Sequence, residues 1–167
     1  LRCLVGSEMC IRDRLYAKSV AVFDTYYKSH DQYLEDHRDG YQTVGDIAYV
    51  DNEGYYFICD RKKDMIITGG VNVYPAEIEN VLDDHPQVAE VAVFGIPDDE
   101  WGEAVCAVIV CMDNLNEKEL INFAKERLSG PKVPKKIFIR SDLPKTGSGK
   151  VLKLSLIHIS EPTRHRR

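Results

Sequence analysis

One lysine of this 167-residue chain ends a glycine-rich turn, in the run 144–150 that reads PKTGSGK. Glycines at this spacing let the backbone approach a ligand, and Lys150 adds a mobile positive charge. Such a lysine can neutralise two anions that must meet, for example a carboxylate and a phosphate. A plain exposed lysine in a turn is the simpler interpretation of this run alone. A P-loop is excluded, because Pro144 stands where that motif needs glycine and Val151 where it needs serine or threonine.

Two further runs carry candidate site residues. The run 60–70 reads DRKKDMIITGG, in which a charged cluster is followed by an apolar stretch and two glycines. Taken alone, the cluster suits a solvated surface, and the two glycines suit a tight turn. The run 41–46 reads YQTVGD and comes just before a strand-like stretch. The carboxylate of Asp46 can accept two hydrogen bonds from a diol such as ribose, although a simple turn accounts for Gly45-Asp46 as well.

Taken in their order along the chain, the three runs resemble motifs of the acyl-adenylate-forming enzymes, the superfamily of acyl-CoA synthetases, peptide-synthetase adenylation domains and luciferases. The resemblance covers roughly residues 19–153. It implies that Lys150 serves the adenylation of a carboxylate by ATP. It also implies that Asp46 binds the ribose and that Arg61 contacts the ribose and phosphates of the nucleotide. Val44 departs from the family pattern, because it separates Thr43 from the Gly-Asp pair.

The same resemblance assigns roles to the run 60–70. Lys63 matches the hinge between a large N-terminal domain and a small C-terminal one. Gly69 and Gly70 are implied to line the path of the thiol after the small domain rotates. Trp101, in the run Trp-Gly-Glu, also matches the family, and we interpret it as a packing residue without a catalytic role.

The implied activity is that of an ATP-dependent acyl-CoA synthetase, in which a carboxylate and ATP give acyl-AMP and CoA then forms the thioester. ATP with Mg²⁺, CoA and a small carboxylic acid are the implied ligands, and no metal site in the chain itself is predicted. An adenylation domain that loads a carrier protein is one alternative, and a non-catalytic binding module is another. The presence of Asp46, Arg61 and Lys150 together argues against the last. The acid is not indicated, because the family's acyl pocket and main phosphate loop would lie in an N-terminal domain upstream.

Both ends of the chain are predicted to be foreign to the fold. The run 4–13 reads LVGSEMCIRD, and the run 155–164 reads SLIHISEPTR. A DNA string that encodes the first has a reverse complement that encodes the second in a shifted frame, which resembles a sequencing-library adapter. Genuine unstructured tails are the alternative. Residues 1–14 and 155–167 are therefore interpreted as adapter-like tails and left out of the fold prediction.

The composition argues against a nucleic-acid-binding protein and against a membrane-spanning one. The chain has 22 basic and 27 acidic residues, and setting the tails aside removes six basic and three acidic ones, which leaves a net charge of −8. This acidity argues against a general electrostatic contact with nucleic acid. Apolar runs fall short of the ~20 residues of a membrane span. Outside the tails, three cysteines lie in apolar runs without CxxC spacing: Cys59, Cys106 and Cys111. This pattern predicts thiols of a reducing compartment. We therefore expect a cytoplasmic protein, and peripheral membrane association remains open.

The predicted fold class is α+β, a small C-terminal domain with a short mixed sheet and two to three helices, preceded by a β-hairpin remnant of the large N-terminal domain. The boundaries expected are 15–61 for the end of the N-terminal domain and 62–154 for the C-terminal one. Asn116 followed by Glu119 predicts a capping box at the start of one helix. The expected elements are a hairpin over 47–59, strands over 65–67, 88–94, 104–110 and 136–140, and helices over 75–82 and after Asn116.

Overall fold

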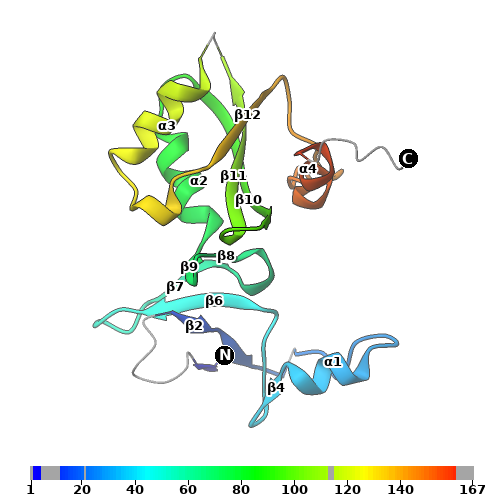
Figure 1. The fold of residues 1–167 in the computed structure, drawn as a ribbon. Helices are drawn as coiled ribbons and strands as arrows, with labels where there is room; N and C mark the ends of the chain where they lie inside the picture. Colours follow the sequence, from blue (N-terminus) through cyan, green and yellow to red (C-terminus); the bar gives the residue numbers. More distant parts are fainter. Residues whose placement is uncertain (1, 5–11, 21, 113–114, 161–167) are drawn as a thin grey trace. The chain divides into compact units, whose positions relative to one another are not determined.

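The computed structural model describes residues 2–4, 12–20, 22–112 and 115–160 (Figure 1). The chain divides into two compact units, residues 1–63 and 64–167. Each unit has its own sheets, and each is described separately below. Within the described residues, no helix is long and apolar enough to cross a membrane.

The first unit is built on a hairpin of β6 (Asp46–Val50) and β7 (Tyr56–Arg61). Asp51 closes the connecting turn, because its Oδ1 accepts hydrogen bonds from the backbone N–H groups of Glu53 and Tyr55, each at 2.9 Å. Gly54 has φ of +87°, a left-handed conformation that favours glycine. The predicted hairpin is therefore confirmed.

Short strands and one helix surround this hairpin within the first unit. The edge strand β2 (Asp13–Arg14) pairs antiparallel with β6, which gives a sheet in the order β2-β6-β7. A second sheet has the order β1-β3-β5-β4. Its strands are β1 (Arg2–Leu4), β3 (Tyr16–Lys18), β4 (His37–Arg38) and β5 (Tyr41–Gln42), and helix α1 covers His30–Glu35.

The second unit has a mixed five-stranded sheet at its centre. Strands β10 (Val88–Asp98) and β11 (Gly102–Cys111) form a long antiparallel ribbon, and β12 (Lys136–Arg140) adds to β11 in parallel. The hairpin of β8 (Ile66–Thr68) and β9 (Val71–Val73) joins the Gly102 end of β11. The remaining elements of this unit are the 3-10 turn η2 (Gly130–Lys132) and the helices α2 (Pro75–Asp83), α3 (Glu117–Lys125) and α4 (Lys153–Ser160). The 3-10 turn η1 (Lys62–Asp64) contains the boundary between the two units in the sequence.

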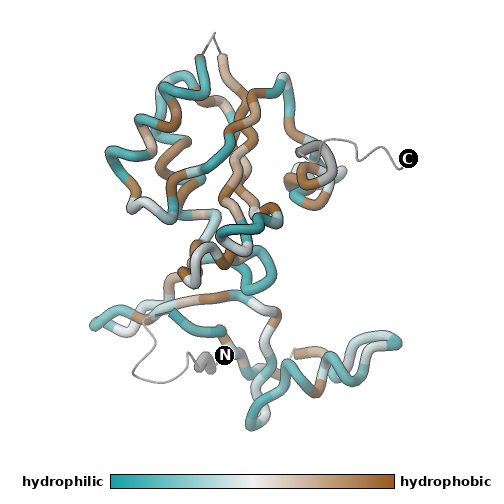
Figure 2. The backbone as a smooth tube through the Cα atoms, viewed as in Figure 1, coloured by the Kyte–Doolittle hydropathy of each residue, from teal (hydrophilic) through white to brown (hydrophobic). Residues whose placement is uncertain are grey.

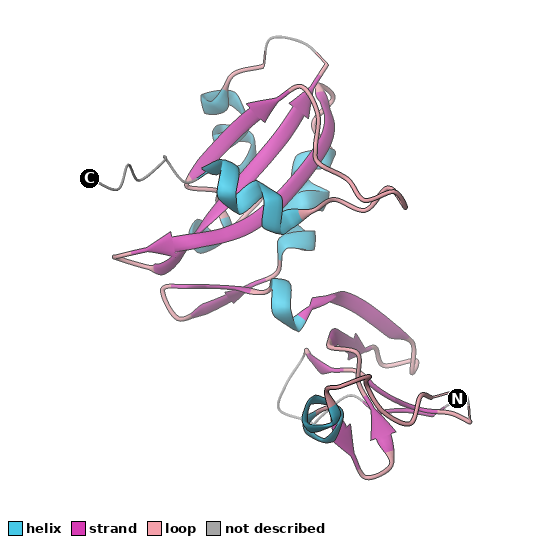
Figure 3. Cartoon of the chain, turned by 90° about the vertical axis from the view of Figure 1, so that its right-hand side faces the viewer, coloured by secondary structure: helices cyan, strands magenta, loops and turns pink. Residues whose placement is uncertain are grey.

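Both faces of this sheet are buried, by different helices (Figure 3). Alternating residues of β10 and β11 point to opposite faces, so each face receives its own apolar set. Val93 and Val105 pack with Ile78 and Leu82 of α2 and with residues of α3. On the other face, Ala92, Phe94, Cys106 and Val108 pack with Leu143 and with Leu156 of α4. Figure 2 shows the hydrophobic residues gathered along this ribbon.

Two predicted helices form for local reasons. Helix α2 begins with Pro75 in its first turn, where the missing N–H costs nothing, and it buries Ile78 and Leu82 on one face. Helix α3 has the predicted capping box, in which Asn116 Oδ1 accepts from Glu119 N at 3.0 Å. The α+β class, the mixed sheet and the count of helices in the second unit are confirmed.

The ends of the chain depart from expectation. Residues 155–160 were expected to stay outside the fold, yet they continue helix α4, in which Leu156 is 1% exposed. Asp13 and Arg14, also inside an expected tail, pair with β6. The expectation that the ends take no part in the fold is therefore wrong. The physical reason is that apolar side chains such as Leu156 pack on an uncovered sheet face whatever DNA encoded them. The adapter origin of these segments remains a prediction.

Candidate functional site

Asp46 and Arg61, the two predicted nucleotide contacts, stand opposite each other in the hairpin. Asp46 begins β6 and Arg61 ends β7, and the two are register partners across the ladder. Arg61 Nε lies 3.7 Å from Asp46 Oδ1, with the side chains 54% and 22% exposed. A carboxylate next to a guanidinium at a strand end can meet a hydroxyl pair and a phosphate of one ligand. The hairpin thus brings together two groups that lie 15 positions apart in the sequence.

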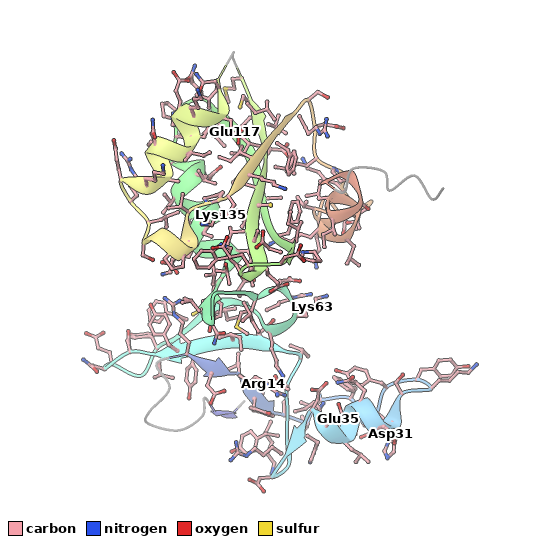
Figure 4. The ribbon with its side chains drawn as sticks, viewed as in Figure 1. Arg14, Asp31, Glu35, Lys63, Glu117 and Lys135 are labelled. Carbon is pink, nitrogen blue, oxygen red and sulfur yellow. The ribbon has the colours of Figure 1, made fainter. Side chains whose placement is uncertain are left out.

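An open depression adjoins this pair inside the first unit. Its volume is about 350 Å³, and its lining includes the cations Arg14, Arg61, Lys62 and Lys63 (Arg14 and Lys63 are labelled in Figure 4). The carboxylate of Asp36 is the acidic member, and it lies 3.9 Å from Arg14. An excess of cations around an open depression suits an anionic ligand such as a phosphate chain.

Backbone bonds shape the rim of the depression. Lys62 N donates to the carbonyl of Gly45 at 2.7 Å, and Gly45 N donates to Thr43 Oγ1 at 3.1 Å. Thr43 is therefore a buried structural residue, and the neighbouring Val44 is 68% exposed and faces the depression. The hydroxyl that could have met a ligand here is turned to the backbone.

Gly69 and Gly70 form the two-residue turn of the β8–β9 hairpin. Their φ values are +56° and +79°, and Thr68 and Val71 pair on either side. Positive φ at both central residues is the geometry that closes a tight hairpin, which explains the glycines. Strand β9 was not predicted, because Val71-Asn72-Val73 has too few apolar residues to stand out as a strand.

Residues 101–103 hold this turn in place. Gly69 N donates to the carbonyl of Trp101 at 2.9 Å, and Ile67 N donates to Glu103 Oε2 at 2.6 Å. A Cβ added at Gly69 would come within 2.8 Å of the Trp101 ring. Lys135 Nζ lies 4.8 Å from the centre of that ring (Lys135 is labelled in Figure 4). These contacts support the interpretation of Trp101 as a packing residue, with the Gly69 turn as its partner.

Lys150 lies in a closed loop between β12 and α4. Lys145 and Val151 pair as an isolated antiparallel bridge, and Leu152 N donates to the carbonyl of Pro144 at 2.8 Å. Gly149 has φ of +81°, so the loop needs glycine at that position. The Lys150 side chain is exposed, and no described residue makes an ion pair or side-chain hydrogen bond with its ammonium group.

The other two lysines of this segment are paired with acids. Lys145 Nζ lies 2.7 Å from Glu90 Oε1 in β10, and Lys153 Nζ lies 2.9 Å from Glu79 Oε1 in α2. The same Glu79 oxygen accepts from Val93 N at 2.8 Å. The loop is thus tied to the body of the unit on both sides of Lys150, which remains available for a ligand.

Lys150 and the glycine turn lie toward opposite ends of the β10–β11 ribbon. The loop is tied to Glu90 near the start of β10, whereas Gly69 contacts Trp101 just beyond its end at Asp98. Asp98 lies eight residue steps beyond Glu90 along β10, roughly 27 Å at about 3.4 Å per step. One orientation of this unit therefore cannot present both groups to the same point.

Sequence reasoning missed the residues that support the site. Glu79, Glu90 and Glu103 are acids on α2, β10 and β11, and no partner was predicted for any of them. No local pattern pairs them with Ile67, Lys145 and Lys153, which lie 36 to 74 positions away. Within the described residues, no group of three metal-ligating side chains stands close enough to hold a metal ion.

The fold and the lysine loop define the class of this molecule. Residues 77–150 match the family model for the AMP-binding enzyme C-terminal domain. This match agrees with the acyl-adenylate-forming, or AMP-binding, superfamily that the sequence motifs predicted.

Similar proteins include several CoA ligases. A 2-succinylbenzoate–CoA ligase of Bacillus cereus is 39% identical over 147 residues, which cover 88% of this chain and 30% of that protein. The o-succinylbenzoate CoA synthetase of Bacillus subtilis, solved with its acyl-adenylate intermediate, is 34% identical with a TM-score of 0.84, over 93% of this chain and 33% of that one. ATP-bound MatB from Rhodopseudomonas palustris is 36% identical with a TM-score of 0.83, over 89% and 30%. The chain spans about 30% of the length of these curated relatives.

Proposed function

We propose that this chain is the C-terminal part of an ATP-dependent acyl-CoA synthetase. The observation that carries the proposal is the exposed Lys150, on a loop whose two flanking lysines are both bound to acids. Among the described residues the Lys150 ammonium has no partner while the neighbouring lysines are bound, which suits a group that meets a ligand. The names of the relatives favour CoA as the acceptor.

Lys150 would act in the first half-reaction. A carboxylate oxygen forms a bond to the α-phosphorus of ATP, and pyrophosphate leaves with the electrons of the broken P–O bond. Two anions approach each other in this step, so a positive charge between their oxygens lowers the barrier. In the second half-reaction the CoA thiol attacks the acyl carbon, and AMP leaves.

The Asp46–Arg61 pair fits the nucleotide in this proposal. Asp46 would accept hydrogen bonds from the ribose, and Arg61 with the cationic depression would face the phosphates. Mg²⁺ would be carried mainly by the phosphates of ATP, since Mg²⁺ keeps few protein ligands in such sites. Cys106 and Cys111 are free thiols, which agrees with the reducing, cytoplasmic location proposed.

The two groups of the second unit would act in turn. Lys150 serves adenylation, and the Gly69–Gly70 turn lines the thiol path when the unit has rotated about Lys63. The placement of the two groups toward opposite ends of β10 supports this proposal. A single orientation of the unit could bring only one of them to the reaction centre. A rigid rotation needs only a few residues to change conformation.

A carrier-protein thiol remains the alternative acceptor, because the residues of this chain serve both reactions alike. The two functions separate in one assay, in which purified acyl-AMP is supplied with CoA or with a phosphopantetheine carrier. Thioester formation with CoA alone supports the synthetase. Formation with the carrier alone would contradict it.

The direct test uses this chain joined to the N-terminal domain encoded upstream in the intact gene. Lys150→Ala should lower acid-dependent ATP–pyrophosphate exchange by about 10²–10³-fold, as expected for loss of one charge-stabilising contact. The same variant should largely spare thioester formation from supplied acyl-AMP. Lys118→Ala, at an exposed lysine of α3, is the matched control and should change neither half-reaction. Equal losses in both half-reactions would refute the role of Lys150, and the chain without that domain should show no exchange.

A further inference from the structure

Thr146 occupies the centre of the Lys150 loop. All three of its polar groups bond to residues 148–150. Its backbone N donates to the carbonyl of Lys150 at 2.8 Å, and its own carbonyl accepts from Gly149 N at 2.9 Å. Its Oγ1 accepts from Lys150 N at 3.2 Å. Both polar backbone groups of Lys150 are therefore partnered by this one residue.

The hydroxyl of Thr146 has a second partner that fixes its direction. Oγ1 lies 2.8 Å from the Oγ of Ser148, and either atom could donate. Because Oγ1 accepts from Lys150 N, its own hydrogen is available for the serine oxygen. Two hydrogen bonds inside the loop therefore meet at Thr146 Oγ1, one from Lys150 N and one shared with Ser148 Oγ.

These hydrogen bonds matter because two glycines give the loop backbone high conformational freedom. Gly147 and Gly149 flank Ser148, and a Cβ at either glycine would meet nothing within 4 Å. Glycine loses more conformational freedom on ordering than any other residue, so an open loop with two of them needs added bonds to hold one shape. Thr146 is half-buried and Lys150 is exposed, so Thr146 is the better anchored of the two residues.

We propose that Thr146 is a positioning residue for Lys150, whose hydroxyl holds the lysine backbone where its ammonium meets the reacting anions. This inference rests on the proposed function, in which Lys150 serves adenylation. Thr146 acts through Lys150 and touches no reacting atom. The acyl transfer to the thiol does not depend on it.

The first test needs no activity and uses the 167-residue chain. Amide hydrogen exchange measured by NMR should be about five- to tenfold faster at Lys150 in Thr146→Val, which keeps the shape and removes the hydroxyl. Thr146→Ser retains the hydroxyl and should restore the slow rate. The Leu152 amide, bonded to Pro144, is the internal control and should be unchanged in both variants. An unchanged Lys150 rate in Thr146→Val overturns the proposal.

The second test uses the chain joined to its N-terminal domain. Thr146→Val should lower the rate of ATP–pyrophosphate exchange about five- to tenfold, with Thr146→Ser close to wild type and thioester formation from acyl-AMP unaffected. If Lys150→Ala abolishes exchange but Thr146→Val leaves it intact, the positioning role alone is wrong. If Lys150→Ala itself leaves exchange intact, the proposed function fails first.

Discussion

Lys145 Nζ lies 2.7 Å from Glu90 Oε1, and this ion pair ties the Lys150 loop to strand β10 across 55 positions of sequence. Both side chains are about 40% exposed, at 39% and 40%. Water screens such a pair, so its contribution to stability is small even though it fixes where the loop lies.

We predict a coupling free energy of about 0.2–1 kcal/mol between Lys145 and Glu90. The measurement is a double-mutant cycle of Lys145→Ala and Glu90→Ala, read by urea unfolding of the second unit. The coupling should shrink in about 1 M salt, because salt screens exposed charges. The Lys132–Glu77 pair, 2.6 Å apart and outside the loop, is the reference cycle. A Lys145–Glu90 coupling of zero at low salt would show that the pair does not hold the loop.

Alanine should be worse at Gly69 than at Gly70. Both residues have positive φ, so alanine at either costs about 1 kcal/mol of backbone strain. At Gly69 the new Cβ also meets the Trp101 ring at 2.8 Å, whereas at Gly70 nothing lies within 4 Å. The free energy of unfolding, measured with urea, should therefore fall further for Gly69→Ala. Equal losses would mean that Trp101 moves aside freely.

Side chains at Gly70 also offer a functional readout in the longer protein. If this turn lines the thiol path, a bulky residue at Gly70 should raise the KM for CoA and leave the KM for ATP unchanged. Gly54, which has a similar φ of +87° in a turn of the first unit, supplies the control for backbone strain alone. A selective rise in the KM for ATP would instead assign the turn to the nucleotide.

Lys63 should tolerate loss of its charge better than loss of its backbone freedom. It lies in η1, where the first unit ends, and its side chain is exposed. Proline locks φ near about −65°, so Lys63→Pro should cripple thioester formation while adenylation stays measurable. Lys63→Ala should be mild in both half-reactions. Similar behaviour of the alanine and proline variants would refute the hinge.

Because of Cys106, the free energy of unfolding should fall at alkaline pH. Burial in the sheet raises the pKa of its thiol from 9.0 to about 11. The unfolded thiol ionises first, so the stability contribution is complete below about pH 9 and is lost as the pH rises toward about 11. Urea unfolding at about pH 8 and about pH 10.5, on either side of the unfolded pKa, should show a larger loss for wild type than for Cys106→Ala. An equal loss in the two proteins would contradict a buried neutral thiol.

Local signals in the sequence predicted the elements that depend on local physics. Pro75 and the Asn116–Glu119 box fixed where helices begin, and the turn around Gly54 fixed the hairpin. These features act through neighbouring residues, so a single chain displays them. The site residues Asp46 and Arg61 were predicted as separate motifs, and only strand pairing makes them partners.

Features that depend on distant partners could not be predicted in this way. Nothing in the sequence distinguishes Glu90 from the other acidic residues, which number 27 in total, and only the fold places Lys145 beside it. Helix α4 was set aside on coding grounds, although Leu156 completes a core that begins at Ala92. The loop geometry around Lys150 could not be predicted either. Thr146 bonds to backbone N–H and C=O groups, which every residue type carries and a sequence motif therefore does not reveal.

The ring packed against Gly69 belongs to the only tryptophan of the chain. It is 40% exposed, and the ammonium of Lys135 lies over it. Intrinsic fluorescence excited at the indole band therefore originates from one place, beside the turn proposed to line the thiol path. If the proposed function holds, a pantetheine arm that arrives there would change the emission without any attached dye, and the tryptophan would serve as an optical probe for the second half-reaction.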